Sequence, residues 1–142
     1  MIIYGKKGGH VESSGLLERV HQSLNGAVLS YIDFSGVVPN PRLSLVKEGI
    51  RIGRSEGVDF LLPIGGGSVI DTAKGIGYGI ANDFEMEDLL YGRVKTDKNL
   101  PIGVILTIAA AGSEMSSSMV LTIEDGMMKR SYGHDCSRPK FA

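Results

Sequence analysis

The amino-acid sequence predicts an α/β fold, in which a parallel sheet with flanking helices is followed by a C-terminal β-hairpin. Short apolar runs alternate with segments of helical periodicity, which is the pattern of βαβ units and of a mostly parallel sheet. Beyond Glu114, two strand-like runs surround the turn Glu124–Gly126, as in a hairpin. The 142 residues, 42% of them hydrophobic, suffice for one domain with an apolar core.

The first half of the chain contains two predicted strands, each followed by a helix. Apolar runs place the strands at Ile2–Tyr4 and Val28–Phe34, and the first helix is expected at Gly15–Asn25, after a loop rich in glycine and lysine. The second helix is expected to begin at Pro41, because proline suits the first helical position and Asn40 can cap it.

The second half contains two more predicted strands and the hairpin. Phe60–Ile64 is wholly apolar, as expected of a strand that is buried on both faces. After three glycines, a helix is predicted with an apolar side that runs from Val69 to Ile80. Ile102–Ile108 is the next buried strand, and Met115–Ile123 with Met127–Tyr132 are the two hairpin strands.

Composition argues against several partners and compartments. The net charge is -1, and Lys and Arg are scattered among Asp and Glu, so the basic face that nucleic-acid binding needs is missing. No apolar run is long enough to cross a bilayer, and no signal peptide opens the chain, so no membrane partner is expected. The single cysteine, Cys136, excludes an internal disulfide and favours a cytoplasmic location.

The glycine turn Gly65–Ser68, between a strand and a helix, is the sharpest local signal. A diphosphate needs backbone N–H groups that point at it and no Cβ in the way, and the helix N-terminus adds a partial positive charge. Ser68 and Asp71 also fit a capping box, which any helix can carry, and the glycines can serve close packing alone. The position after a buried strand favours a phosphate site.

Two common phosphate-binding motifs are absent. No Gly-x-x-x-x-Gly-Lys-Ser/Thr run exists, and the turn after the first strand, Gly5–His10, lacks the Gly-x-Gly-x-x-Gly spacing. The three histidines have no metal-ligand spacing, and His134–Cys136 is interpreted as a loop with a free thiol. Any dinucleotide site must therefore be of a different design.

Three ordered motifs resemble those of the iron-containing alcohol dehydrogenases. Phe60–Lys74 (FLLPIGGGSVIDTAK) resembles the cofactor-binding motif of that family, and Gly36–Pro41 (GVVPNP) and Thr107–Glu114 (TIAAAGSE) resemble two others at the family's spacing. Tyr4–Gly5 with Ser14–Val20 resembles the butanol-dehydrogenase-like branch. The similarity covers essentially the whole chain.

The resemblance implies that residues 1–142 are the Rossmann-like NAD(P)-binding domain of a two-domain enzyme. Such enzymes transfer a hydride between the nicotinamide and an alcohol or aldehyde, and most of them are homo-oligomers. Their Fe²⁺ or Zn²⁺ is held by one Asp and three His of an all-helical domain, which we expect to be absent here, as is the short stretch before the first strand. We therefore expect this chain alone to be inactive and to contain neither catalytic nor metal-binding residues.

The resemblance also implies a set of cofactor-binding residues. Asn40 is expected on the adenosine side, the glycine turn at the diphosphate, and Lys129 at the nicotinamide ribose. Thr107, Ser116 and Ser118 are expected beside the nicotinamide half. The complete set is Asn40, Gly66, Gly67, Ser68, Asp71, Thr107, Ser116, Ser118 and Lys129.

The chain departs from the family pattern at two places. In the third motif Ile108, Ala110 and Ala111 replace residues that are usually Thr, Gly and Thr, so two hydroxyls are lost. Gly5 stands where NAD-preferring relatives carry an Asp for the ribose 2′-hydroxyl, and two lysines follow it. NADP is therefore favoured over NAD. The alternatives are a relative such as a glycerol dehydrogenase or a dehydroquinate synthase, and a non-catalytic module that binds a nucleotide or phosphosugar.

Overall fold

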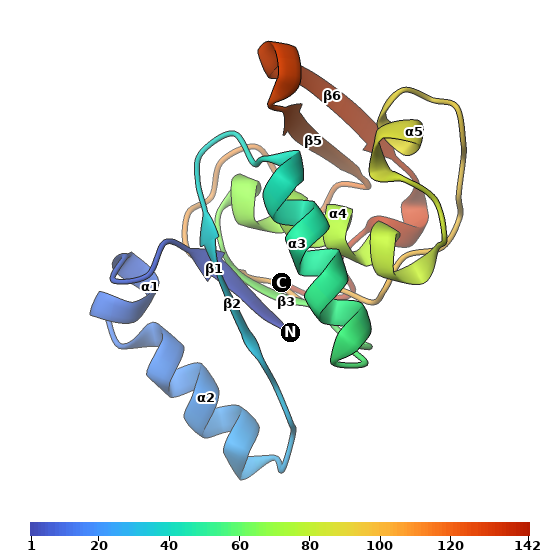
Figure 1. The fold of residues 1–142 in the computed structure, drawn as a ribbon. Coiled ribbons are helices and arrows are strands. Elements are labelled where there is room, and N and C mark those ends of the chain that lie inside the picture. Colours follow the sequence, from blue (N-terminus) through green and yellow to red (C-terminus); the bar gives the residue numbers. More distant parts are fainter.

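The computed structural model describes residues 1–142 and contains two separate sheets. Four parallel strands form the main sheet in the order β2-β1-β3-β4, and two antiparallel strands form a hairpin (Figure 1). The strands are β1 (Ile2–Gly5), β2 (Asp33–Val37), β3 (Leu62–Gly65), β4 (Ile105–Leu106), β5 (Ser118–Ile123) and β6 (Met128–Gly133). The predicted fold class is confirmed.

Five α-helices accompany the strands, and they cover both faces of the main sheet. They are α1 (His10–Ser13), α2 (Leu16–Gly26), α3 (Leu43–Ser55), α4 (Gly67–Ala81) and α5 (Met86–Leu90), and single 3-10 turns lie at Asp125–Met127 and Asp135–Ser137. The sheet grows from β1 to β2 in one direction and from β1 to β3 in the other. Right-handed crossovers therefore place α2 and α3 on opposite faces, and the order reverses between β1 and β3.

The two faces of β1 contribute to two different cores. Ile3 belongs to a cluster of 21 buried residues that includes α3 and α4. Ile2 and Tyr4 point to the other face, where six buried residues, including Leu17 and Val20 of α2, form a smaller cluster. This alternation follows from the two-residue period of a strand.

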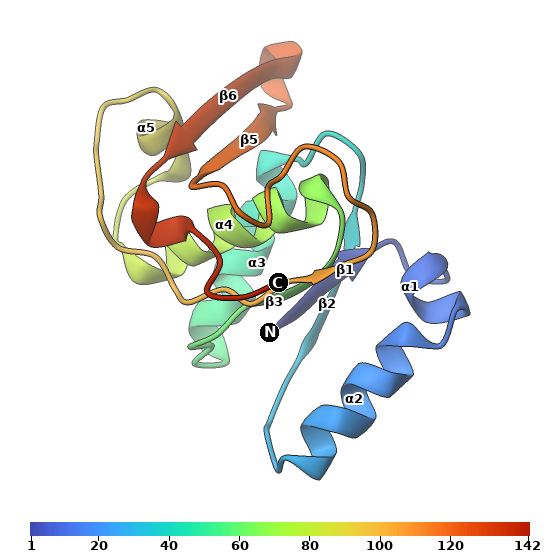
Figure 2. The same ribbon diagram turned by 180° about the vertical axis from the view of Figure 1, so that it is seen from behind.

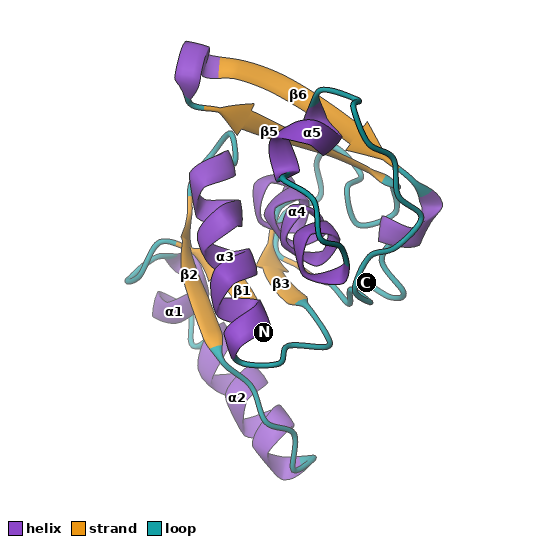
Figure 3. Cartoon of the chain, turned by 45° about the vertical axis from the view of Figure 1, so that its right-hand side comes forward, coloured by secondary structure: helices purple, strands orange, loops and turns teal.

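Helix α4 lies at the centre of the molecule, between the main sheet and the hairpin (Figure 3). The predicted apolar side is confirmed at Val69, Ala73 and Ile76, but burial extends further: all residues from Val69 to Gly79 except Asp71 are buried. The reason is that β5 and the segment before it cover the face of α4 turned away from the sheet. None of the helices combines the length and the apolar character needed to cross a bilayer.

The second strand lies later in the chain than predicted. Helix α2 extends to Gly26, and Val28 then adopts a left-handed conformation with φ of 56° and is 91% exposed. Pairing with β1 starts only where Ile2 faces Asp33. Val28 therefore belongs to the turn that precedes the strand, and the predicted strand Val28–Phe34 is corrected to Asp33–Val37.

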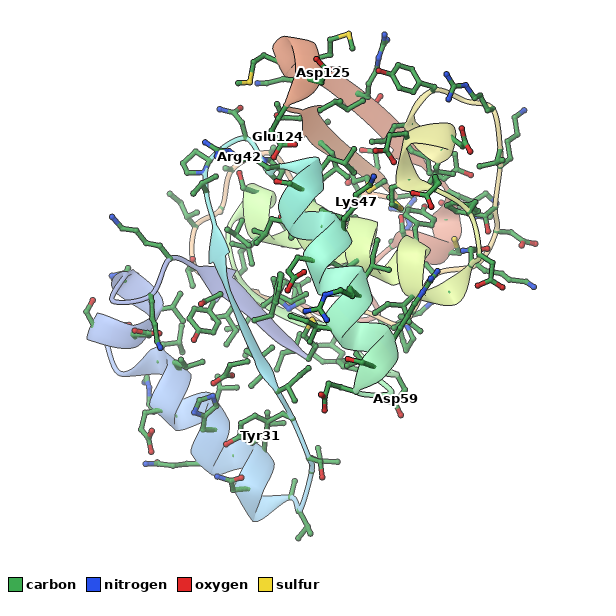
Figure 4. All side chains as sticks on the ribbon, viewed as in Figure 1. Tyr31, Arg42, Lys47, Asp59, Glu124 and Asp125 are labelled. Atoms are coloured by element: carbon green, nitrogen blue, oxygen red, sulfur yellow. The ribbon has the colours of Figure 1, made fainter.

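Helix α3 begins at Leu43, so the prediction that Pro41 opens this helix and Asn40 caps it is wrong. Asn40 has φ of 58°, and the carbonyl of Pro41 accepts a hydrogen bond from the N–H of Thr122 in β5 (2.8 Å). These residues are held by the hairpin, which also supplies the cap: the N–H of Ser44 donates to the Glu124 carboxylate (3.3 Å), which lies beside the start of α3 in Figure 4.

The fourth strand is shorter than the predicted run Ile102–Ile108, because only Ile105–Leu106 forms a regular ladder with β3. Ile102 makes an isolated bridge with Leu61, and Gly103 pairs with Phe141 near the C-terminus. The C-terminal segment pairs with the other edge of this stretch, where the N–H of Val104 donates to the carbonyl of Phe141 and the N–H of Lys140 donates to the carbonyl of Ile102. In the hairpin, the first strand starts at Ser118 rather than at residue 115.

Candidate functional site

The glycine turn joins β3 to α4 at the carboxyl edge of the sheet. The N–H groups of Val69 and Ile70 donate to the carbonyl of Gly66 (3.0 and 3.2 Å), whereas those of Gly67 and Ser68 belong to the first turn and have no intrahelical acceptor. No side chain caps α4, so the capping-box interpretation is wrong. Two free N–H groups at the start of a 15-residue helix suit an anion.

Two glycines of this turn are needed for different reasons: Gly66 is closely packed, whereas Gly67 borders open space. A Cβ on Gly66 would lie 2.7 Å from Cγ2 of Ile108, which excludes any larger residue without movement of that side chain. A Cβ on Gly67 would meet only Oγ of Ser113, at 3.5 Å. Gly67 is therefore kept bare on the side where a ligand would lie.

Two hollows meet at Gly67 and Ser68, which line both of them. The hairpin-side hollow has a volume of about 330 Å³ and the sheet-side hollow about 270 Å³. The hairpin-side hollow is lined by Asn40, Pro41, Gly67, Ser68, Asp71, Ala110, Ala111, Ser113, Val120, Thr122 and Lys129. The sheet-side hollow is lined by Val37, Val38, Pro39, Gly66, Gly67, Ser68, Val69 and Ile108.

The two hollows differ in chemistry. The hairpin-side hollow carries an amide, a carboxylate, an ammonium group and several hydroxyls, whereas the sheet-side hollow has a mostly apolar lining. Ile108, one of the departures from the family pattern, is 64% exposed and forms part of this apolar lining next to Gly66. The arrangement can therefore hold an elongated ligand with an anionic centre, a polar end and an apolar end.

The structure brings together some of the predicted site residues and separates others. Asn40, Asp71 and Lys129 line the hairpin-side hollow together with the glycine turn. Asn40, which was expected on the adenosine side, therefore shares a hollow with Lys129, which was expected at the nicotinamide ribose. Thr107 lines neither hollow, and its N–H donates to the carbonyl of Gly65 (3.1 Å). The remaining two, Ser116 and Ser118, also lie outside both hollows and contact a buried lysine instead.

That buried lysine, Lys74, is the main residue that sequence reasoning missed. It lies one turn after Asp71 in α4, and both side chains reach the segment between β4 and β5, which loops around the start of α4 in Figure 2. Burial raises the pKa of the Asp71 carboxyl, although hydrogen bonds from Val120 and Ser113 lower it. The available signal was that Asp71 and Lys74 are the only charged residues between Leu62 and Ala81.

The remaining titratable groups do not form a second site in the fold. No three His, Cys, Asp or Glu side chains come together in a way that could hold a metal ion, so these residues do not fit a metal centre. His21 contacts the Asp33 carboxylate (3.0 Å) and stacks on Tyr31, which lies beside α2 in Figure 4. Cys136 is a free thiol, as predicted.

Comparisons with known proteins identify the family of the chain. The family model described as iron-containing alcohol dehydrogenase matches residues 1–142. NADH-dependent butanol dehydrogenase A of Clostridium acetobutylicum is 41% identical over 142 residues, which are 100% of this chain and 36% of that protein. NADPH-dependent aldehyde reductase YqhD of Escherichia coli is 33% identical over 146 aligned residues, with the same two shares.

A solved structure extends the similarity to three dimensions. The crystal structure of NADH-dependent butanol dehydrogenase A from Thermotoga maritima superposes with a TM-score of 0.93 and 34% identity, over 99% of this chain and 35% of that one. The chain thus spans little more than a third of the length of the relatives that it matches. From the family match over its whole length, the chain belongs to the iron-containing alcohol dehydrogenase family.

Proposed function

We propose that residues 1–142 form the NAD(P)-binding domain of a two-domain, metal-dependent enzyme that interconverts alcohols and aldehydes by hydride transfer. The observation that carries this proposal is the glycine turn with two free N–H groups between two chemically different hollows. The names of the relatives, a butanol dehydrogenase and an aldehyde reductase, support the substrate class. They do not favour the glycerol dehydrogenase, lyase or non-catalytic alternatives. The intact enzyme is proposed to be a cytoplasmic homo-oligomer.

The diphosphate of the cofactor would lie at the glycine turn. The N–H groups of Gly67 and Ser68 and the Ser68 hydroxyl would donate to its oxygens, and the dipole of α4 would favour its charge. The bare Gly67 lets the diphosphate approach the backbone. The turn also lies at the carboxyl edge of the sheet, beside the reversal between β1 and β3, where ligands of open α/β sheets bind.

The two ends of the cofactor would occupy the two hollows. The apolar lining of Val37, Val69 and Ile108 suits the adenine ring. The polar hairpin-side hollow suits the ribose hydroxyls and the carboxamide of the nicotinamide half, with Asn40 and Lys129 as donors. When bound, the cofactor supplies the nicotinamide carbon that gives or takes the hydride. The chain's own residues hold and orient that ring.

We further propose that NADP is bound at least as tightly as NAD. Gly5 ends β1 without a carboxylate side chain, and Lys6 and Lys7 follow it with exposed side chains. Ammonium groups attract a 2′-phosphate, and no carboxylate at position 5 opposes it. The relatives named above include both an NADH-dependent and an NADPH-dependent enzyme, so both cofactors occur among proteins similar to this one.

The decisive experiment compares NADPH and NADH binding by the wild type and Gly67→Ala, measured by calorimetry. The new Cβ makes only an ordinary contact with Ser113, so the fold is retained, but the methyl group would stand where the diphosphate lies. We expect affinity to fall about ten-fold or more, equal to at least about 1.4 kcal/mol. The matched control is Gly26→Ala, at the exposed end of α2, where a Cβ would have no neighbour within 4 Å.

Three outcomes of this experiment are informative. Loss of affinity in Gly67→Ala, with normal affinity in Gly26→Ala, supports the diphosphate site. A wild type that binds neither cofactor, or equal affinity in Gly67→Ala, contradicts it. NADH binding well ahead of NADPH would leave the site in place and overturn the preference for NADP.

A further inference from the structure

Lys74 is a charged side chain with no exposed surface, in a helix that is otherwise almost wholly apolar. Its ammonium group donates hydrogen bonds to the carbonyl oxygens of Ser113, Ser116 and Ser118, each at 2.8 Å. The Oγ of Ser116 lies 3.2 Å away. Three carbonyls match the three N–H donors of an ammonium group, so the charge is fully paired with one short segment of the chain.

Asp71, one turn earlier in α4, holds the two ends of the same segment. One carboxylate oxygen accepts from the hydroxyl of Ser113 (3.0 Å), and the other accepts from the N–H of Val120 (3.0 Å). Both of these partners line the hairpin-side hollow, as Gly67 and Ser68 do. The segment 113–120 is therefore attached to α4 at its ends by Asp71 and along its length by Lys74.

Because the charge of Lys74 is buried, a partly detached segment is much less favourable than the fully attached one. A buried ammonium group is strongly unfavourable unless its donors are paired, whereas an apolar residue at position 74 would pack against the segment without that cost. If the segment moved away, Lys74 would lose three acceptors and the carbonyls would lose their donor. The arrangement seen here is therefore strongly favoured over partly detached ones.

We propose that Lys74 is a positioning residue of the cofactor site: it holds the segment 113–120 in the one arrangement that completes the hairpin-side hollow. The inference rests on the proposed function, in which this hollow takes the nicotinamide half. Lys74 itself lines neither hollow, so it acts through Ser113 and Val120 rather than by touching the cofactor. The adenosine half, on the other side of the glycine turn, does not depend on it.

The test measures the two halves of the cofactor separately in Lys74→Met, which keeps the length of the side chain and removes its charge and donors. Binding of reduced nicotinamide mononucleotide reports the hairpin-side hollow, and binding of ADP reports the glycine turn and the sheet-side hollow. We expect the mononucleotide affinity to fall about ten-fold and the ADP affinity to stay within about two-fold. The matched control is Lys47→Met, which removes a lysine that is paired with Glu87 at the surface and lines neither hollow.

The outcomes separate the two proposals. An unbound wild type contradicts the proposed function, whereas equal losses for both ligands, or no loss, in folded Lys74→Met overturn the positioning role. A second measurement needs no variant and no ligand: in the wild type at neutral pH, the paired ammonium of Lys74 gives a slowly exchanging ¹⁵N resonance. Its absence overturns the proposal even if Lys74→Met does not fold.

Discussion

At Lys74, burial and neighbouring charges act in opposite directions. The pKa of the Lys74 ammonium group is lowered to about 8, mainly by burial. The carboxylates of Asp71 and Glu114 oppose this shift, and the positive charge of Arg138 adds to it. The three carbonyl acceptors also favour the protonated form. The lysine is therefore charged at neutral pH, and it loses its proton at a lower pH than an ordinary lysine.

This shift predicts a pH dependence of stability. The pKa in the folded protein, about 8, lies below the ordinary value of 10.5, so between these two pH values the unfolded chain binds more protons. Lys74 therefore makes the free energy of unfolding rise with pH in this window. Urea unfolding of the wild type and Lys74→Met checks this, because other groups cancel in the comparison. We expect the wild type to gain stability relative to the variant as the pH rises; a constant or falling difference contradicts the prediction.

At the scale of elements, α3 and α4 cross at glycines, which lets the two helices approach closely. Gly49 and Gly53 of α3 face Ile76 and Ile80 of α4, with the side chains of α4 filling the space that a Cβ would need. Gly79 of α4 is packed against an isoleucine of α3 in the same way. This crossing fixes the direction of α4, and with it the direction in which the glycine turn points.

A single methyl group tests the crossing. In Gly49→Ala the new Cβ would lie 2.8 Å from Cγ1 of Ile76 and 3.2 Å from Cε1 of Phe34. Overpacking of this kind costs about 1–3 kcal/mol of unfolding free energy. Gly26→Ala, at an exposed helical position, is expected to stabilise by roughly 0.5 kcal/mol, because alanine loses less backbone entropy. Thermal unfolding of both variants measures the difference, and equal effects would argue against a close crossing.

At the scale of the whole molecule, stability is distributed unequally over the two faces of the main sheet. The face of α3 and α4 carries a cluster of 21 buried residues, whereas α2 is attached through a cluster of six. Figure 1 shows α2 extending away from the rest of the chain. Fewer buried contacts make local opening easier, so α2 belongs to the less stable part of the fold.

Hydrogen exchange measures this distribution directly. We expect the amides of α2 to exchange faster than those of α4, because α4 is buried on nearly all sides. Addition of NADPH should slow amide exchange in residues 66–71 and 113–120, the two segments that contain lining residues of the hollows. The exchange rates in α2 should not change. Protection confined to α2, or equal rates in both helices, would count against the two-core description.

Much of the fold and part of the site could be predicted from local pattern. Buried parallel strands are apolar runs, and a strand-to-helix turn that binds phosphate has to be rich in glycine, so β3, Gly65–Ser68 and α4 are visible in the sequence. The hairpin turn at Glu124–Gly126 has its own residue signature. The family resemblance then connected these features to a cofactor, and the family match confirmed the resemblance itself.

Contacts between distant segments decided the rest. Helix α3 starts at Leu43 because the carbonyl of Pro41 is bonded to Thr122 and the carboxylate of Glu124 reaches the N–H of Ser44. Burial alone would raise the pKa of Glu124, but the hydrogen bonds from Ser44 lower it. Likewise, Lys74 looks like any helical lysine until its partners, some forty residues later, are in place. Local patterns encode burial and turns, whereas the partner of a buried charge or an unpaired backbone group depends on which segments meet in space.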